Sequence, residues 1–352
     1  MVMRQPEDEI ADLQSSGLRR RLRCVDSPDD TRLTIGGRRV VNFSSNDYLG
    51  LSRHPLLAEA AVRALEEFGT GSGASRLICG SLAPHHRLEE LIASIKGTES
   101  ALAFSSGYAA AVGSTSALVG KGDTIILDKL CHASLVDGAR LSGATIRVFP
   151  HNRLDKLERL LTSTRAKTPG DSRLLVITES VFSMDGDLAA LEEIIALKDQ
   201  HDALLLLDEA HAIGVLGPTG QGLAEALRVQ SHVDLQLGTL GKAVGSAGGY
   251  IASSRPMADL LLNKARSFIY STAPPPAQAA AAVAGLRLIA APEGASLRRH
   301  LQELLSGFAR LTGTPAPASA IVPMILGTND EALAASKTIL DSGFLVPAIR
   351  YP

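Results

Sequence analysis

Three polar residues follow apolar runs of the kind that form buried strands. Asp208 ends the run LLLLD and precedes Glu209 and His211, Ser180 follows LLVITE, and Lys242 ends VDLQLGTLGK among glycines. Ligands of open parallel sheets bind beyond the carboxyl ends of the strands. A lone Asp at a strand end is more often a helix cap, but a lysine at the same edge of the sheet favours a catalytic or cofactor-binding role for the Asp. We therefore expect Asp208 and Lys242 to share one site.

The glycines around Lys242 could instead indicate a nucleotide site, and two such sites are excluded by spacing. A P-loop needs a glycine where this chain has Gln236, and Ser or Thr where it has Ala243. The glycines within residues 69–73 are spaced GxGxG and follow a charged stretch, which does not fit a dinucleotide site. The glycines beside Lys242 instead suggest close approach of the backbone to a planar ligand.

Pyridoxal phosphate (PLP) requires a lysine for the imine, an acid at the ring nitrogen, a phosphate cradle and a group on the ring face. The sequence offers candidates for each role: Lys242, then Asp208, then Ser106, Gly107, Tyr108 and Thr239, and finally His132. Asp208 as a carboxylate would keep the ring nitrogen protonated. The cradle candidates at 106–108 follow a strand-like run and open a helical stretch, where backbone N–H groups attract anions.

The elements that must position these residues alternate along the chain. Short apolar runs occupy residues 101–104, 124–128, 145–149, 174–178, 203–208 and 248–252. Amphipathic stretches such as LDKLERLL and LEEIIALKDQ lie between some of them. This alternation predicts an α/β fold with a mostly parallel central sheet flanked by helices.

The chain is expected to contain a large and a small domain. A helix with proline in its first turn is predicted near Pro84. Beyond the prolines at 274–276, a helix over 296–311 and an apolar strand over 320–326 suggest a smaller α+β domain. We predict an N-terminal segment (1–49), a large PLP-binding domain (50–280) and a small C-terminal domain (281–352).

Composition argues against several classes of partner. A formal net charge of -2 gives no basic field for nucleic acid. Cys24, Cys79 and Cys131 form no CxxC pair, so we expect neither a disulfide framework nor a zinc knuckle, and a cytoplasmic setting fits best. The polar N-terminus contains no secretory signal, and the most apolar segment, 279–291, is too short to span a membrane.

Two charged stretches are interpreted as surface features when taken alone. His85 and His86 beside Glu89 and Glu90 have helical spacing, but no HExxH pattern supports a metal site. We expect no metal there and interpret the stretch as a solvated helix start. The run at 19–21 is likewise expected to be a surface charge run.

Eight ordered motifs resemble the α-oxoamine synthases. They are NFSSNDYLGLSRHP (42–55), GTGSGASRLICG (69–80), FSSGYAA (104–110), HASLVDGARLSGA (132–144), TESVFSMDGD (178–187), DEAHAIGVLG (208–217), GTLGKAVGSAGG (238–249) and FIYSTAPPP (268–276). The resemblance covers most of the chain. It implies a fold-type I PLP enzyme, related in fold to aminotransferases of class I and II, that acts as a homodimer.

The resemblance also implies residue roles. Lys242 would form the Schiff base, Asp208 would pair with the pyridinium nitrogen, and His132 would stack on the ring and contact substrate. The remaining implied contacts are His211 and Ser180 at the phenolic oxygen, Gly107, Tyr108 and Thr239 at the phosphate, Asn46 at the amino-acid carboxylate, and Arg19 at the substrate.

Within the family, SSNDYLGL, GSGASRL and FIYSTAPPP are most similar to the biotin-biosynthesis branch. That branch implies an acyltransferase that condenses L-alanine with pimeloyl-CoA, or with a pimeloyl acyl carrier protein, and releases CO₂ and the thiol. The alternatives are a glycine-using member, such as 2-amino-3-ketobutyrate CoA ligase or 5-aminolevulinate synthase, a PLP aminotransferase, and a non-catalytic PLP-binding homologue.

Two positions depart from the family pattern. Ala212 follows the DEAH histidine where glycine is common, and it also occurs in glycine-using relatives. The sequence ends at Pro352, whereas the family has a threonine directly afterwards and a substrate-binding arginine further on. We therefore expect a truncated sequence whose small domain is incomplete and whose substrate binding is weak.

Overall fold

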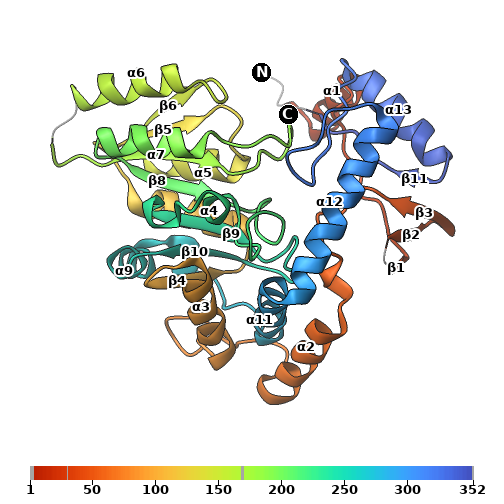
Figure 1. Ribbon diagram of the computed structural model, residues 1–352, viewed down its shortest axis with the longest axis horizontal. Helices are drawn as coiled ribbons and strands as arrows, with labels where there is room; N and C mark the ends of the chain where they lie inside the picture. Colours follow the sequence, from red (N-terminus) through yellow and green to blue (C-terminus); the bar gives the residue numbers. More distant parts are fainter. Residues whose placement is uncertain (1–3, 30, 168–169, 351–352) are drawn as a thin grey trace. The chain divides into compact units, whose positions relative to one another are not determined.

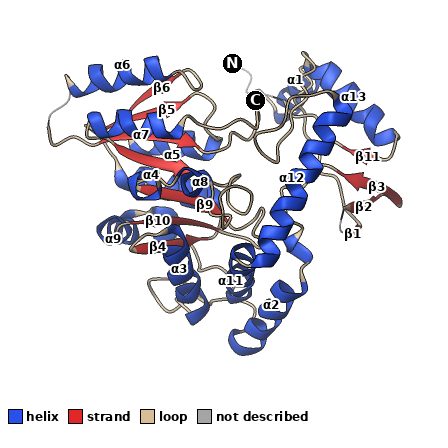
Figure 2. Cartoon of the chain, in the orientation of Figure 1, coloured by secondary structure: helices blue, strands red, loops and turns tan. Residues whose placement is uncertain are grey.

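The computed structural model describes residues 4–29, 31–167 and 170–350, which form two compact units. The large unit comprises the described residues of 47–322, and the small unit joins the described residues of 4–46 to 323–350. Figures 1 and 2 draw the chain with its elements labelled.

The large unit contains a seven-stranded sheet in the order β4-β10-β9-β8-β7-β5-β6. Its strands are β4 (Ser100–Phe104), β5 (Thr124–Asp128), β6 (Thr145–Phe149), β7 (Leu174–Glu179), β8 (Leu204–Asp208), β9 (Leu235–Thr239) and β10 (Gly249–Ser253). The β10 strand is antiparallel to β4 and β9, while the pairs from β9 to β6 are parallel. The predicted α/β fold with a mostly parallel sheet is therefore confirmed.

Helices cover both faces of this sheet (Figure 2). The helices of the large unit are α2 (Pro55–Phe68), α3 (Ala83–Lys96), α4 (Gly107–Leu118), α5 (Ala133–Ser142), α6 (Leu154–Arg165), α7 (Leu191–Gln200), α8 (Leu223–Leu227), α9 (Arg255–Lys264), α10 (Arg266–Ile269), α11 (Pro276–Ala290) and α12 (Pro292–Thr312), with 3-10 turns η1 (Leu51–Arg53) and η2 (Gln230–His232). Of these, α2 and α12 pack on α11. Leu206 packs with α4 and α5 on one face. Leu205 and Leu207 pack with α6 and α7 on the other. This two-sided burial explains why the strands are continuous apolar runs.

The small unit contains a four-stranded mixed sheet. Its elements are α1 (Pro6–Ser15), β1 (Ser27–Asp29), β2 (Arg32–Ile35), β3 (Arg38–Asn42), α13 (Asn329–Asp341) and β11 (Phe344–Leu345). The first three strands are antiparallel, and β11 pairs in parallel with β3. Thr328 caps α13, because its hydroxyl accepts from the Glu331 N–H and the Glu331 carboxylate accepts from the Thr328 N–H.

Two sequence expectations are wrong. The apolar stretch 320–326 forms no strand, because Pro323 has no N–H to donate and Ser319 turns the chain by accepting from the Ile321 N–H. His85 and Glu89 are buried rather than solvated.

Residues 281–322 group with the large unit. The boundaries proposed from sequence for the PLP-binding and small domains stay a prediction.

Candidate active site

The carboxyl ends of three neighbouring strands each carry an acid. Glu179 of β7 lies opposite Asp208 of β8 in the strand register, and Asp128 ends β5 on the other side of β7. All three are buried. Only Asp208 was identified from the sequence. Glu179 could have been found by the same rule, since it directly ends an apolar run.

Lys242 lies beside His211 and Tyr48 in a continuous polar chain. The Lys242 Nζ is 2.6 Å from the His211 Nε2, and the Tyr48 hydroxyl is 2.7 Å from the His211 Nδ1. Burial, and then the positive charge of Lys242, lower the pKa of His211 to about 3. The imidazole is therefore neutral near pH 7, and only one of its nitrogens carries a proton. Tyr48 was missed from the sequence because it is remote from His211 along the chain.

Burial shifts the ionisation of Asp208 and Lys242 in opposite directions. It raises the pKa of Asp208 to about 6, against the opposing charge of Lys242. It lowers the pKa of Lys242, against the opposing carboxylates of Asp208 and Glu179. The amine of Lys242 consequently loses its proton more readily than an exposed lysine does.

His132 stands at the N-terminus of α5, next to the same acids. Its backbone N–H donates to the Glu179 carboxylate, and its Nδ1 is 2.8 Å from the Ser134 hydroxyl. Burial, and then the charge of Lys242, lower the pKa of His132. The structure thus brings His132, Asp208, His211 and Lys242 within electrostatic reach of one another.

A candidate anion cradle lies where α4 begins beside the end of β9. The Ser106 hydroxyl accepts from the Ala109 N–H at 3.0 Å, which caps the helix. The first-turn N–H groups of Gly107 and Tyr108 have no acceptor within a helix and attract anions. Thr239 adjoins this turn, because a Cβ placed on Gly107 would lie 3.5 Å from the Thr239 Oγ1.

Other residues predicted for the site have different surroundings. The Ser180 hydroxyl is completely buried and donates to the Asp208 carbonyl at 3.1 Å, so it supports the turn after β8. Arg19 and Asn46 belong to the small unit, where Arg19 donates to the Gln14 side chain at 2.6 Å. Their predicted substrate contacts stay predictions. Pro352, where the expected truncation falls, lies outside the described residues.

Comparison with known proteins identifies the family. The family model described as aminotransferase class I and II matches residues 38–352. The chain belongs to the aminotransferase class I and II family. Within this family, the 8-amino-7-oxononanoate synthase of Geobacter sulfurreducens is 48% identical over 98% of this chain and 88% of its own length.

Solved structures of similar fold agree with the assignment. A serine palmitoyltransferase variant from S. paucimobilis, solved with a bound PLP–myriocin aldimine, is 31% identical with a TM-score of 0.89 over 97% of this chain and 89% of its own. An 8-amino-7-oxononanoate synthase from Francisella tularensis is 27% identical with a TM-score of 0.74 over 89% of each chain. The resemblance to α-oxoamine synthases and the fold-type I architecture are therefore confirmed.

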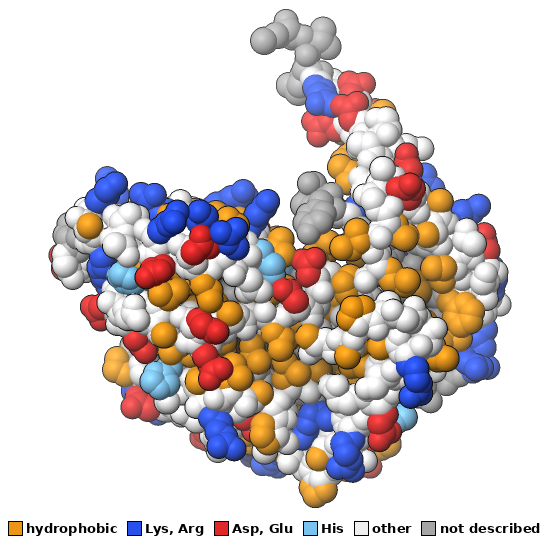
Figure 3. All heavy atoms as spheres, turned by 45° about the horizontal axis from the view of Figure 1, so that its top comes forward, with side chains coloured by type: hydrophobic (Ala, Val, Ile, Leu, Met, Phe, Trp, Pro, Cys, Tyr) orange, Lys and Arg blue, Asp and Glu red, His pale blue; other side chains and the backbone are white. Residues whose placement is uncertain are grey.

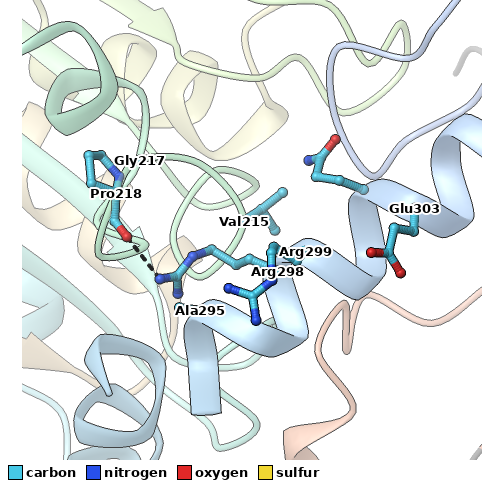
Figure 4. A pocket seen from close by; sticks show the side chains of 8 residues that line it. Val215, Gly217, Pro218, Ala295, Arg298, Arg299 and Glu303 are labelled. Atoms are coloured by element: carbon cyan, nitrogen blue, oxygen red, sulfur yellow. Dashed lines mark hydrogen bonds between the residues drawn. The ribbon is translucent and has the colours of Figure 1, made fainter. Parts of the chain in front are cut away.

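A separate cavity of about 520 Å³ lies between α12 and the loop that follows His211. Figure 4 shows Arg298 reaching from α12 toward Pro218, whose carbonyl accepts its hydrogen bond at 3.0 Å. None of the residues predicted for the active site lines this cavity. Arg298 also donates to the Ile289 carbonyl at 2.7 Å, so its buried guanidinium joins helix ends and loop. We assign it a structural role.

Proposed function

We propose that this chain catalyses the PLP-dependent, decarboxylative condensation of L-alanine with a pimeloyl thioester, giving 8-amino-7-oxononanoate, CO₂ and a free thiol. The contact between Lys242 and His211 beside the buried Asp208 is the observation that carries this proposal. High identity to an 8-amino-7-oxononanoate synthase over nearly the whole chain supports the choice of substrates. The reaction belongs to biotin biosynthesis.

The residues present fit PLP. The first turn of α4 and Thr239 would hold the phosphate, Asp208 the ring nitrogen, His132 the ring face, and Lys242 the aldehyde carbon. Placing the ring nitrogen cation beside Asp208 would favour its carboxylate form, opposing the effect of burial. When bound, PLP supplies an electron sink for the carbon next to the substrate amine.

Side chains of the protein then remove the α proton of the substrate. The lowered pKa of Lys242 makes its Nζ available as a base for the α proton of alanine. If the Tyr48 hydroxyl donates to the Nδ1 of the neutral His211, the Nε2–H of His211 is directed at the Lys242 Nζ. That arrangement stabilises Lys242 as a neutral amine. We assign His211 the role of holding this nitrogen in place.

Substrate contacts are proposed for Arg19, Asn46 and His132. A guanidinium and a side-chain amide are suited to carboxylate groups, which alanine and the pimeloyl chain both carry. Either CoA or an acyl carrier protein would deliver the acyl group.

Glycine as the amino-acid substrate is the second candidate. Ala212 follows His211 and is completely buried. Alanine at this position, where glycine is common in the family, also occurs in the glycine-using relatives, and its methyl group fills space beside His211 that a glycine would leave open. The structural similarity to serine palmitoyltransferase adds L-serine as a co-substrate worth testing.

We further propose a cytoplasmic homodimer. Leu77, Ile78 and Tyr270 are large apolar side chains with exposed fractions of 50%, 78% and 72%, and a second copy of the chain would cover them in the proposed dimer. Figure 3 shows one face on which hydrophobic side chains (orange) are exposed among charged ones. In the described parts of the chain, no helix is long and apolar enough to cross a membrane. Light scattering of the purified protein tests the dimer.

The decisive experiment measures thiol release and product mass. Purified protein with PLP, pimeloyl-CoA and L-alanine should release CoA and yield a product with the mass of 8-amino-7-oxononanoate. Parallel reactions contain glycine with acetyl-CoA, and L-serine with palmitoyl-CoA. Release with glycine alone would favour the ligase branch, and amino-group transfer without thiol release would show an aminotransferase.

A further inference from the structure

His151 and Asn152 follow β6 and connect two loops at the carboxyl edge of the sheet, the turn 128–132 and the hairpin 181–188. The His151 Nδ1 is 3.0 Å from the Asp128 Oδ1, and its Nε2 is 2.8 Å from the Asp187 Oδ2. The Asn152 N–H donates to the Asp128 Oδ2 at 3.0 Å, and its side-chain amide donates to the Leu188 carbonyl at 3.0 Å. Asn152 has φ 52°, a left-handed conformation that asparagine tolerates better than most residues.

Both loops lead to residues of the candidate active site. Asp128 begins the turn 128–132 that ends at His132, and it accepts the Leu130 N–H at 2.8 Å. Asp187 lies in the hairpin 181–188, where the Phe182 N–H donates to its carbonyl at 3.1 Å. The hairpin begins two residues after the acid that accepts the His132 N–H.

Aromatic packing adds to these contacts. The His151 ring meets the Phe182 ring edge to face, with centroids 4.3 Å apart. Phe182 is completely buried, so the base of the hairpin is fixed in the core. His151 thus contacts the hairpin through both a carboxylate and an aromatic ring.

The charge state of His151 decides how many of its contacts are hydrogen bonds. Carboxylates only accept, and a neutral imidazole has one N–H, whereas a protonated one has two. Asp128 from the end of β5 and Asp187 from the hairpin are the charged groups that face the ring. Burial lowers the pKa of His151, but the hydrogen bonds to Asp187 and Asp128 outweigh it and raise the pKa above its ordinary value.

We propose that His151 is a positioning residue: bridged between Asp128 and Asp187, its protonated ring holds the hairpin 181–188 against the turn 128–132 and so fixes the contact between Glu179 and His132. The role of His132 toward PLP rests on the proposed function. His151 itself touches neither cofactor nor substrate and acts through its two carboxylate partners.

This arrangement has a definite pH dependence. Because the folded pKa of His151 is raised, the bridge is complete below the ordinary histidine pKa of about 6.5 and weakens as the pH rises through the folded pKa. Affinity for PLP should contain a component that falls over the same alkaline range as the ring loses its proton.

The test uses Asp187→Asn, which keeps the size of the side chain and one acceptor for the Nε2–H but removes the charge. NMR titration should show a lower pKa for His151 in this variant. The dissociation constant for PLP, measured by fluorescence between pH 6 and 9, should rise roughly tenfold at pH 6, the effect of weakening one charge-assisted hydrogen bond, and should lose its His151-dependent component. The variant His151→Asn, whose side chain cannot bridge both carboxylates, should raise the dissociation constant for PLP by a similar factor at pH 6.

Asp199→Asn is the matched control, because Asp199 faces the exposed His232 at 3.5 Å. It should leave PLP affinity unchanged. If Asp187→Asn and His151→Asn lower the unfolding temperature but bind PLP as tightly as the parent at every pH, the contacts are only structural and the proposal is overturned. Failure of the parent protein to release thiol would refute the proposed function, while PLP binding and NMR would still decide this proposal.

Discussion

Replacing Tyr48 by phenylalanine removes a single hydroxyl from the polar chain that ends at Lys242. The His211 Nδ1 then loses its hydrogen-bond partner 2.7 Å away, which we infer sets which of the two ring nitrogens carries the proton. Loss of one such buried hydrogen bond costs about 1–2 kcal/mol. Because the bond orients a group beside the cofactor lysine, we expect this cost to appear in PLP binding and catalysis as a roughly 5- to 30-fold effect.

The assay compares the dissociation constant for PLP and kcat for alanine-dependent CoA release in the parent and Tyr48→Phe. Thr312→Val is the control, because the Thr312 hydroxyl is exposed on α12 and hydrogen-bonds to the Phe308 and Ala309 carbonyls of its own helix and to Thr314. The Tyr48 variant should be impaired in one or both parameters, and the Thr312 variant in neither. Equal values for all three proteins would refute the inference that Tyr48 sets the tautomer of His211.

Three further changes follow from the structure. Lys96→Met should lower the free energy of unfolding in urea by about 3–5 kcal/mol, because it leaves the carboxylate of Glu209 buried without its ion-pair partner. Asp208→Asn should abolish tight PLP binding but stabilise the cofactor-free protein at pH 8 by roughly 1–3 kcal/mol. Since the folded pKa is about 6 against an ordinary 3.8, this gain should shrink as the pH falls through that window. Gly249→Ala should weaken PLP binding roughly 5- to 150-fold, because the new methyl would lie 2.6 Å from the backbone of Gly107.

Controls separate these effects from general damage. In Gly307→Ala the new methyl has no neighbouring atom within 4 Å, so PLP binding should not change. Lys96→Met combined with Glu209→Leu should be less destabilised than Lys96→Met alone, since the uncompensated charge is removed. Equal losses in the single and double variants would contradict this account of the buried pair. A cofactor-free Asp208→Asn protein less stable than its parent at pH 8 would contradict the assignment of the raised pKa.

The central sheet was predictable because its inner strands, such as β5, β7 and β8, are buried on both faces and are therefore continuous apolar runs, whereas the edge strand β6 is mostly exposed. Asp208 was predictable because it ends β8, and Lys242 because it follows β9 closely among glycines. The stretch 320–326 has the same apolar composition, but Pro323 and the turn at Ser319 exclude it from a sheet. Apolar composition alone could not distinguish this loop from a strand.

The burial of the polar side chains on one face of α3 could not be predicted, because Arg76, Glu209 and their other hydrogen-bond partners lie outside this helix in the sequence. His85, Glu89 and Lys96 have the spacing of one helix face, which resembles a solvated surface. Glu89 instead forms a two-pronged contact with the Arg76 guanidinium, at 2.9 and 2.8 Å. Lys96 contacts Glu209. These groups meet only in the folded chain, where Glu209, the partner of Lys96, directly follows Asp208.

The most direct test of the central claim is to reduce the PLP-loaded protein with borohydride and locate the modified residue by peptide mass spectrometry. The account predicts a single pyridoxyl group on Lys242. Attachment to another lysine, such as the exposed Lys264, or no attachment at all, would contradict it.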